Sequence, residues 1–158
     1  MALSLRPMRQ EEWDSYLAHN IEEYAREIAE NYEIDLDRAR QSAQDQTNHR
    51  LNAGLQTPNF YAYCIEQETA AGRERIGQLG FSINREEEFA WLDDIELDEP
   101  YRGQGYGGEV LTLVEHALAA QGIHNLSLHV FGANQRAFRC YQKSGFKITG
   151  YNMMKKWS

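Results

Sequence analysis

The sequence predicts a single α/β domain over residues 1–158, with a mixed, mostly antiparallel sheet of six or seven strands and about four helices. A chain of this length fits one domain with a sizeable core. Residues 60–97 hold three strand-like segments separated by short polar breaks, which is typical of an antiparallel meander. The strand, helix and strand that follow indicate a βαβ unit, whose two strands run parallel.

The chain before the meander predicts an edge strand and two helices. Two leucines near the N-terminus alternate with polar residues until Pro7, which ends a strand because it has no N–H to donate. Residues 11–29 repeat apolar side chains every three or four positions, the period of an amphipathic helix. Asp35 can cap a more polar helix over residues 36–51, which we expect to be largely exposed.

The meander itself predicts three strands. Residues 60–65 and 76–83 flank a polar turn and form a hairpin, and residues 89–97 add the third strand. Along a strand, successive side chains point to opposite faces. The third strand would therefore place one set of residues on each face, namely Phe89, Trp91, Asp93, Ile95 and Leu97 against Ala90, Leu92, Asp94 and Glu96.

Helical spacing returns after residue 108 and continues to Ala120, where Gly122 can stop the helix as its left-handed residue. Residues 126–130 alternate again and predict a strand. Asn134 begins another short helix that Gly145 ends. The final two strands are predicted over residues 146–148 and 151–157.

Charge and composition exclude some classes of partner. The chain has 24 acidic and 16 basic residues, a net charge of −8, with no Lys/Arg run, so we expect no nucleic-acid partner. No stretch approaches the roughly 20 apolar residues that span a bilayer, and the N-terminus lacks the apolar run of a signal peptide. We therefore expect a cytoplasmic protein with no membrane partner. Cys64 and Cys140 fit no CxxC pattern and should be reduced thiols.

The segment Arg102-Gly103-Gln104-Gly105-Tyr106-Gly107-Gly108 predicts an anion site between a strand and a helix. Its glycines let successive N–H groups turn toward one point, and the helix start adds free donors and a positive dipole end. Arg102 can add a full charge, or pair instead with Asp98 or Glu99. The segment lacks the Gly-Lys-Ser/Thr ending of a P-loop and the spacing of a dinucleotide-binding motif.

The segment resembles the Arg/Gln-x-x-Gly-x-Gly/Ala motif of the GCN5-related N-acetyltransferase (GNAT) superfamily. The resemblance extends to the lead-in at residues 95–101 and to the downstream pattern of Asn134 through Tyr141, Lys143, Gly145 and Phe146. It covers roughly residues 59–157. A GNAT-like domain binds acetyl-CoA in a V-shaped opening between its two central parallel strands.

The resemblance implies that acetyl-CoA is the co-substrate and that no metal is needed. The pyrophosphate would lie on the glycine loop, and the backbone of Ile95 and Leu97 would bond the pantetheine arm. The Leu97 N–H would also stabilise the thioester carbonyl as charge develops on it. The implied cofactor-binding residues are Ile95, Leu97, Arg102, Gly103, Gln104, Gly105, Tyr106, Gly107, Gly108, Asn134 and Tyr141. Asn134 can at the same time cap the helix that follows it.

Tyr141 matches the general acid of the family, about two helical turns beyond Asn134 on the same face. The family takes its general base from either central strand. The candidates here are Glu96 and His129 first, followed by Asp94 and Asp93. The amine attacks the thioester directly in this family, so neither cysteine is needed as a nucleophile.

The predicted function is transfer of an acetyl group to a primary amine of a small molecule or peptide, by direct attack in a ternary complex. In the family, the first two helices and the last hairpin wall the acceptor groove, and residues such as Tyr24, Glu27 and Tyr32 would suit a cationic amine. The alternatives are a non-catalytic module that binds or senses CoA or acyl-CoA, and a polyphosphate- or nucleotide-binding domain sharing the loop. The sequence leaves the oligomeric state open, a homodimer included.

Overall fold

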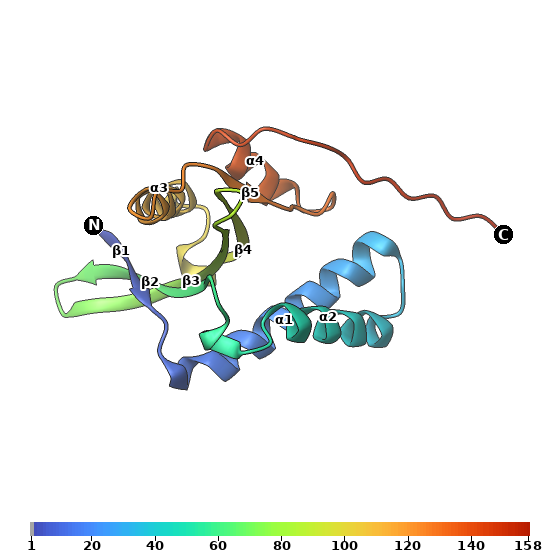
Figure 1. Cartoon of the computed structure of the whole chain (residues 1–158), viewed down its shortest axis with the longest axis horizontal. Coiled ribbons are helices and arrows are strands. Elements are labelled where there is room, and N and C mark those ends of the chain that lie inside the picture. The colour runs from blue at the N-terminus through green and yellow to red at the C-terminus, as the bar shows by residue number, and fades with distance from the viewer. Residues whose placement is uncertain (1) are drawn as a thin grey trace.

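The computed structural model describes residues 2–158 and contains a five-stranded sheet in the order β1-β2-β3-β4-β5 together with four α-helices (Figure 1). The strands are β1 Leu3–Pro7, β2 Phe60–Thr69, β3 Gly72–Asn84, β4 Phe89–Leu97 and β5 Leu126–Leu128. The helices are α1 Gln10–Tyr32, α2 Leu36–Arg50, α3 Tyr106–Ala119 and α4 Gln135–Lys143, with short 3₁₀ turns at Gly54–Gln56 and Glu99–Tyr101. No helix within residues 2–158 is long and apolar enough to cross a bilayer.

The sheet confirms both the antiparallel meander and the parallel βαβ unit. Strands β1 to β4 pair antiparallel in sequence order, and β4 pairs parallel with β5. The β4–β5 pairing is short, running only from Ala90 opposite Leu126 to Leu92 opposite Leu128. Beyond Leu92, β4 continues to Leu97 with a partner strand on its β3 side alone. The two central strands therefore part at their carboxyl ends.

Helices cover the two faces of the sheet. On one face, α3 packs Val110, Val114 and Leu118 into the main core with residues of β2, β3 and β4. On the other face, α1 packs Trp13 and Tyr16 against β2. Alternation along β2 explains this division, since Phe60, Ala62 and Cys64 belong to the α1 side whereas Tyr61, Tyr63 and Ile65 belong to the α3 side.

Helix α2 packs on α1 and contributes little to the main core. Only Ala39, Ala43 and Thr47 are buried, so the helix is largely exposed as predicted. The two buried alanines contact Ala25 and Ile28 of α1, where their small side chains allow a close approach. The Asp35 carboxylate accepts a hydrogen bond from the Arg38 N–H at 3.2 Å, which confirms the predicted cap.

The predicted faces of β4 are wrong beyond Leu92, because a β-bulge shifts the alternation by one residue. Gly80 of β3 lies opposite Asp94, while the next β3 residue, Phe81, lies opposite Leu92, so Asp93 is the extra residue. Ala90 and Leu92 lie in the main core, and after the bulge Ile95 and Leu97 pack against the same core. Asp94 and Glu96 consequently point to the α1 side of the sheet.

The prediction of six or seven strands is also wrong, because residues 144–158 form neither strand nor helix. The predicted strand over residues 126–130 ends at Leu128. A strand needs hydrogen-bonding partners as well as an alternating pattern, and none is paired with the free edge of β5 in residues 2–158. The final residues instead run away from the body of the molecule toward the C-terminus (Figure 1).

Candidate functional site

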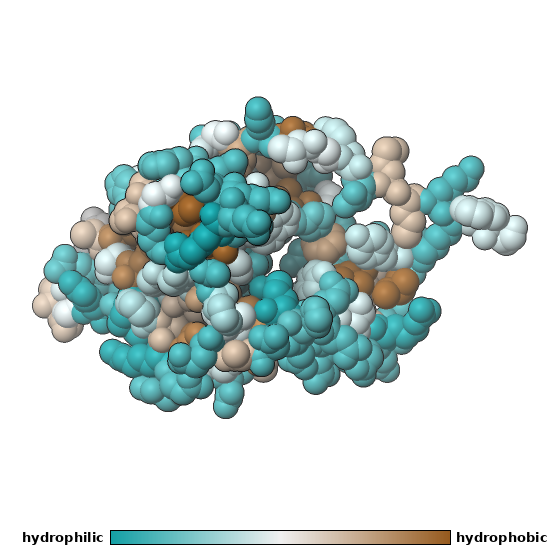
Figure 2. All heavy atoms as spheres, viewed as in Figure 1, coloured by the Kyte–Doolittle hydropathy of each residue, from teal (hydrophilic) through white to brown (hydrophobic). Residues whose placement is uncertain are grey.

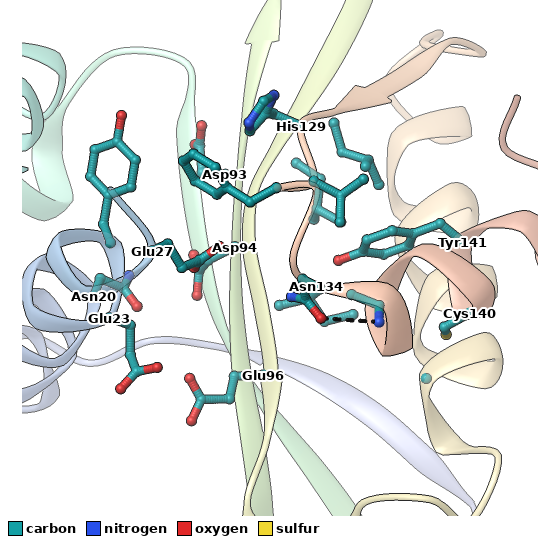
Figure 3. Close-up of a pocket in the computed structure, with 18 of the residues that line it drawn as sticks. Asn20, Glu23, Glu27, Asp93, Asp94, Glu96, His129, Asn134, Cys140 and Tyr141 are labelled. Atoms are coloured by element: carbon teal, nitrogen blue, oxygen red, sulfur yellow. Dashed lines mark hydrogen bonds between the residues drawn. The ribbon is translucent and has the colours of Figure 1, made fainter. Parts of the chain in front are cut away.

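A cavity of about 1520 Å³ lies where β4 and β5 separate. Its wall is formed by α1 and α2 on one side, β4 at its base, and the glycine loop, α4 and the residues after β5 on the other. In the space-filling view the surface is hollowed between the sheet-bearing body and the two N-terminal helices (Figure 2). Figure 3 shows the acidic side chains on the α1 and β4 side facing Asn134 and Tyr141.

The glycine loop has the backbone geometry of an anion site. Gly103 and Gly105 have φ values of 73° and 83°, a left-handed region that favours glycine. Gly105 is the residue before α3 and makes no side-chain cap, so the first N–H groups of this 14-residue helix are left for another acceptor. Gly103, Gly105, Tyr106, Gly107 and Gly108 all line the cavity.

Helix α4 packs directly against this loop. A β-carbon added at Gly107 would lie 3.0 Å from Cys140 Sγ, and one added at Gly103 would lie 3.1 Å from Arg136 Nη2. A β-carbon at Gly107 would crowd the Cys140 side chain, whereas the end of the flexible Arg136 side chain could move aside from one at Gly103. The close packing brings cations to the anion site that the sequence reasoning missed, namely Arg136, Arg139 and Lys143, all of which line the cavity.

A signal for these cations exists in the sequence. All 24 acidic residues precede residue 116, and six of the 16 basic residues follow it with no acid among them. Spacings of three and four residues place Arg136, Arg139 and Lys143 along one side of α4. The α4 side of the cavity is therefore basic although the whole chain is acidic.

The Arg102 guanidinium pairs with neither the Asp98 nor the Glu99 carboxylate, the partners considered from sequence. Its Nε donates to the Leu97 carbonyl oxygen at 2.8 Å, and its Nη2 lies 3.3 Å from Glu96 Oε1. These contacts tie the start of the glycine loop to the end of β4. The Arg102 side chain is 44% exposed and lines the cavity, so its guanidinium can still present N–H groups to an anion.

If the loop binds acetyl-CoA, as the sequence resemblance implies, replacing Arg136 by alanine should weaken that binding about tenfold, since it removes a partly solvated charge-assisted contact beside the loop. Isothermal titration with acetyl-CoA measures the change. Arg38→Ala is the matched control, because Arg38 is an exposed arginine on α2 outside the cavity. Equal affinities for the two variants would remove Arg136 from the anion site.

Asn134 and Tyr141 both line the cavity, on the side opposite α1 (Figure 3). Asn134 Oδ1 accepts a hydrogen bond from the Ala137 N–H at 3.2 Å, which confirms the helix cap. The ring of Tyr141 packs on Phe146 with centroids 5.7 Å apart. Burial raises the pKa of Tyr141 to about 12, and the nearby Cys140, Asp94 and Glu27 add to the increase. Its hydroxyl therefore stays protonated at neutral pH.

Asp94 is the most perturbed carboxyl of the cavity. The Tyr16 hydroxyl donates a hydrogen bond to Oδ1, while Oδ2 is buried with no partner among residues 2–158. Burial raises the pKa of Asp94 to about 7; the bond from Tyr16 opposes the increase and the nearby Asp93 adds to it. Gly80 leaves the space, because a β-carbon there would lie 2.5 Å from the Tyr16 hydroxyl and 3.1 Å from Asp94 Oδ1.

This shift makes Asp94 destabilising at high pH. The pKa of Asp94 is higher in the folded chain than in the unfolded chain, so protonation of Asp94 favours the folded state. The free energy of unfolding therefore falls as the pH rises toward about 7 and the proton is lost. Asp94→Asn keeps the acceptor for Tyr16 but carries no charge. The variant should raise the free energy of unfolding by about 2–4 kcal/mol at pH 8 relative to its effect at pH 4. Urea unfolding at both pH values measures this difference, and an equal effect at both would contradict the shifted pKa.

The other two carboxylates of β4 already have cationic partners. Asp93 accepts a hydrogen bond from the Ser82 hydroxyl at 2.7 Å and forms an ion pair with Arg50 at 3.2 Å, and burial raises its pKa. Glu96 lies 2.7 Å from His19 Nε2 and also contacts Arg102. Both residues line the cavity. Of the three β4 carboxylates, only Asp94 has no ion pair among residues 2–158.

His129 follows the last residue of β5 and lines the cavity, but it is exposed. Its ring packs edge-on against Phe131 with centroids 4.7 Å apart. Phe131 also contacts Tyr24 and Tyr32 of α1, at centroid distances of 6.3 and 6.2 Å. These aromatic contacts close one end of the cavity between α1 and the segment after β5.

Helix α1 adds a second acidic group to the cavity. Glu23 and Glu27 line it at a spacing of four residues, together with Asn20 (Figure 3). Tyr24 lines it as well. The pKa of Glu27 is raised by burial and by the negative charges of Glu23 and Glu30. Neither Glu23 nor Glu27 forms an ion pair within residues 2–158.

Both cysteines are free thiols, as predicted. Cys64 is buried under α1, where burial raises its pKa and its Sγ lies 3.4 Å from a Glu12 carboxylate oxygen. Cys140 lies on α4 against the glycine loop. Within residues 2–158, no cluster of three or more His, Cys, Asp or Glu residues has the arrangement of a metal site.

Comparisons with known proteins by family model, by sequence and by structure agree with one another. The family model of the Acetyltransferase (GNAT) family matches residues 6–146. The chain is 32% identical to the uncharacterised N-acetyltransferase YycN of Bacillus subtilis over 99% of both chains, and the crystal structure of YycN superposes with a TM-score of 0.92 over 99% of both.

The names of two more distant relatives state their substrates. Spermine/spermidine N(1)-acetyltransferase of Bacillus subtilis is 36% identical over 61 residues, which is 38% of this chain and 40% of that protein. Spermidine N-acetyltransferase of Vibrio cholerae, solved in complex with CoA and spermine, is 18% identical and superposes with a TM-score of 0.65 over 94% of this chain and 82% of that one. At 18% identity, the similarity to the Vibrio cholerae enzyme shows a shared fold only.

Proposed function

Because the chain belongs to the GNAT acetyltransferase family, we propose that it transfers the acetyl group of acetyl-CoA to a primary amine of a small molecule or peptide by direct attack in a ternary complex. One observation supports this proposal above the others. A single cavity has a cationic glycine loop at one side, a protonated tyrosine beside it, and carboxylates on the opposite wall. These are the groups that acyl transfer from a phosphate-bearing thioester to an amine requires.

The proposed acetyl-CoA site uses the residues identified from the sequence, together with the cations of α4. The backbone from Gly103 to Gly108 and the start of α3 would bind the pyrophosphate, with Arg102 and Arg136 contributing charge. The backbone of Ile95 and Leu97 would bond the pantetheine arm, since beyond Leu92 β4 has no strand partner on the β5 side. Asn134 would bond the arm through its amide N–H₂, because its Oδ1 is already occupied by the helix cap.

We propose Asp94 as the general base in place of the two candidates ranked first from sequence. A base must be able to take up a proton near neutral pH, and the pKa of Asp94 is about 7. Glu96 is held between His19 and Arg102, and His129 is exposed after the end of β5. Glu96 and His129 remain the alternative bases, and their variants belong in the same assay.

In the proposed step, Asp94 accepts a proton from the acceptor ammonium and leaves a neutral amine. The nitrogen lone pair forms the new bond to the thioester carbonyl carbon, with the Leu97 N–H facing the carbonyl oxygen. The carbon–sulfur bond then breaks as Tyr141 donates its proton to the departing thiolate. The attacking nitrogen gives up its remaining extra proton to the Tyr141 phenolate, which leaves a neutral amide and restores the tyrosine. Asp94 and Glu27 both lie near enough to Tyr141 for their charges to raise its pKa, which is consistent with acid and base flanking one reaction centre.

We propose that the acceptor enters beside α1 and is cationic. Glu23, Glu27 and Asp94 give this wall negative charge with no ion-pair partner from the chain. An ammonium ion would supply the missing partner, and aromatic rings such as those of Tyr24 and Tyr32 also attract cations. The names of the polyamine acetyltransferases among the relatives agree with this chemistry but do not identify the acceptor.

Titration of the protein with acetyl-CoA tests the co-substrate half of the proposal. Saturable binding that ATP does not displace is the expected result. The absence of saturable binding would rule out the proposed function. Displacement by ATP at similar concentrations would instead indicate a general polyphosphate site.

A further inference from the structure

The β-bulge of β4 places two consecutive carboxyl groups on the same face of the sheet. Asp93 is the extra residue of the bulge, and Asp94 follows it. Asp93 contacts Arg50 of α2 and Asp94 contacts Tyr16 of α1, and these two helices lie on the same side of the sheet (Figure 1). Figure 3 shows both carboxyl groups on the α1 side of β4. Neighbouring strand residues otherwise point to opposite faces, so the bulge is what brings these two acids together.

The two acids of the bulge have different partners. Asp93 Oδ1 forms an ion pair with Arg50 Nη1 at 3.2 Å, and Asp93 Oδ2 accepts a hydrogen bond from the Ser82 hydroxyl at 2.7 Å. Both contacts favour the anion of Asp93. Asp94 Oδ1 accepts a hydrogen bond from the Tyr16 hydroxyl, while its Oδ2 is buried with no partner among residues 2–158. Asp93 therefore ionises before Asp94.

Arg50 is the last residue of α2, and its neighbours in the chain hold it in place. Thr47 and Leu51 are buried, and the Leu51 N–H donates to the Thr47 carbonyl oxygen at 2.8 Å. Leu51 packs in the same cluster as Tyr16, the hydrogen-bond donor of Asp94. Of the α1 and α2 residues that line the cavity, all within residues 2–158, Arg50 is the only arginine or lysine. The end of α2 therefore fixes one cation beside the bulge.

Arg50 is the cation among the groups around Asp94. The titratable groups that face Asp94 from the elements around it are Tyr16, Glu23 and Glu27 of α1, Arg50 of α2, Asp93 and Glu96 of β4, and Tyr141 of α4. Adjacent carboxylates oppose each other's ionisation, and a cation paired with one of them reduces that opposition. Burial raises the pKa of Asp94 most, the hydrogen bond from Tyr16 lowers it, the charge of Asp93 raises it further, and the charge of Arg50 lowers it.

We propose that Arg50 is a positioning residue of the site, which offsets the charge of Asp93 and so lets Asp94 lose its proton near neutral pH. The inference rests on the proposed role of Asp94 as general base. Without Arg50, Asp94 would have to ionise beside an uncompensated buried carboxylate and would hold its proton to higher pH. A base that keeps its own proton cannot accept one from the acceptor ammonium.

Carbon-13 NMR of the aspartate carboxyl groups through a pH titration tests the inference without any activity. Asp94→Asn identifies the Asp94 signal by its loss. In Arg50→Gln the midpoint of this signal should rise by about one pH unit, since the charge removed is partly solvated. Arg50→Lys keeps the charge and should keep the unaltered midpoint. Arg40→Gln is the matched control, because Arg40 is an α2 arginine of similar exposure, 45% against 46%, that pairs with Glu22 outside the cavity.

A double variant tests whether Arg50 acts by offsetting Asp93. In Arg50→Gln/Asp93→Asn both charges are absent, and the midpoint of Asp94 should return to the unaltered value or fall below it, because the charge of Asp93 has the larger effect on Asp94. Asp93→Asn alone should lower the midpoint, a result that does not depend on how Arg50→Gln folds. An unchanged midpoint in Arg50→Gln or in Asp93→Asn, or a double variant that keeps the raised midpoint, would overturn the inference.

The pH dependence of kcat/KM separates this inference from the proposed function. In Arg50→Gln the rise of kcat/KM should move to higher pH with the midpoint, so that activity falls about tenfold at pH 6 and recovers by pH 9. An equal loss at every pH, with an unchanged midpoint, would show a merely structural role for Arg50. If the unaltered protein acetylates no amine, the proposed function fails, whereas the NMR midpoints still decide whether Arg50 controls the ionisation of Asp94.

Discussion

Replacing Asp94 by asparagine should lower kcat/KM for acetyl transfer to an amine by about 10²–10⁴-fold, the usual contribution of a positioned general base. An aliphatic ammonium has a pKa near that of lysine, about 10.4, so most acceptor molecules arrive protonated at neutral pH. Asp94, with a pKa of about 7, can accept that proton. The variant keeps the hydrogen bond from Tyr16 and removes only the ability to take up a proton.

The pH profile gives this prediction a second readout. In the unaltered protein, kcat/KM should rise with pH near pH 7, as Asp94 loses its proton. In Asp94→Asn this rise near pH 7 should be absent. Asp14→Asn is the control, because Asp14 is an exposed acid on α1 outside the cavity. Activity of Asp94→Asn within threefold of the unaltered protein would exclude Asp94. A larger loss in Glu96→Gln or His129→Asn would move the role to that residue.

Replacing Tyr141 by phenylalanine should lower kcat about 10²–10³-fold and leave the affinity for acetyl-CoA nearly unchanged. The hydroxyl is needed only when the thiolate departs, so its loss affects the transition state more than the bound state. The ring keeps its packing on Phe146, so folding should be unaffected. Steady-state kinetics together with calorimetric binding of acetyl-CoA separate the two effects.

Tyr61→Phe is the matched control for Tyr141. Tyr61 packs on the α3 side of the sheet, and its hydroxyl bonds Arg85 and Gln121 away from the cavity. This variant should keep full turnover. If Tyr141→Phe binds acetyl-CoA normally and also keeps full turnover, Tyr141 is not the general acid.

Local patterns in the sequence predicted most of the fold correctly. The amphipathic period of α1, the Asp35 cap of α2, and the strand-helix-strand order around the glycine loop each depend on neighbouring residues alone. The glycine loop was predictable for the same reason, since Gly103 and Gly105 permit a backbone that other residues rarely adopt. The cap at Asn134 likewise depends on a residue only three positions away.

Features that depend on distant contacts were not predictable from one sequence. The bulge at Asp93 arises from pairing with β3 and reverses which side Asp94 faces, so strict alternation misplaced every residue after it. The pKa of Asp94 depends on burial beneath Tyr16, which lies 78 residues earlier in the chain. The same reason applies to residues 145–158. Their alternating pattern predicts strands, but a strand also needs a hydrogen-bonding partner strand, and none pairs with them within residues 2–158.

The arginines of α4 were missed for a different reason. They are visible in the sequence, but the charge of the whole chain, −8, conceals a basic final segment without a single acid after residue 115. Counting charge by segment would have indicated that the helix after the βαβ unit carries the cationic side of the cavity. The structure adds the position of Arg136 beside Gly103, which depends on the close packing of α4 on the loop.

Release of CoA thiol from acetyl-CoA in the presence of a panel of amines tests the central claim most directly. The panel should include monoamines, diamines, polyamines and peptides with a free N-terminus, each assayed with the unaltered protein and with Asp94→Asn. Acetyl transfer predicts release that depends on at least one amine, yields the acetylated amine in equal amount, and falls in Asp94→Asn. Saturable acetyl-CoA binding with no amine-dependent release across the panel would contradict it and identify a module that binds acyl-CoA without chemistry.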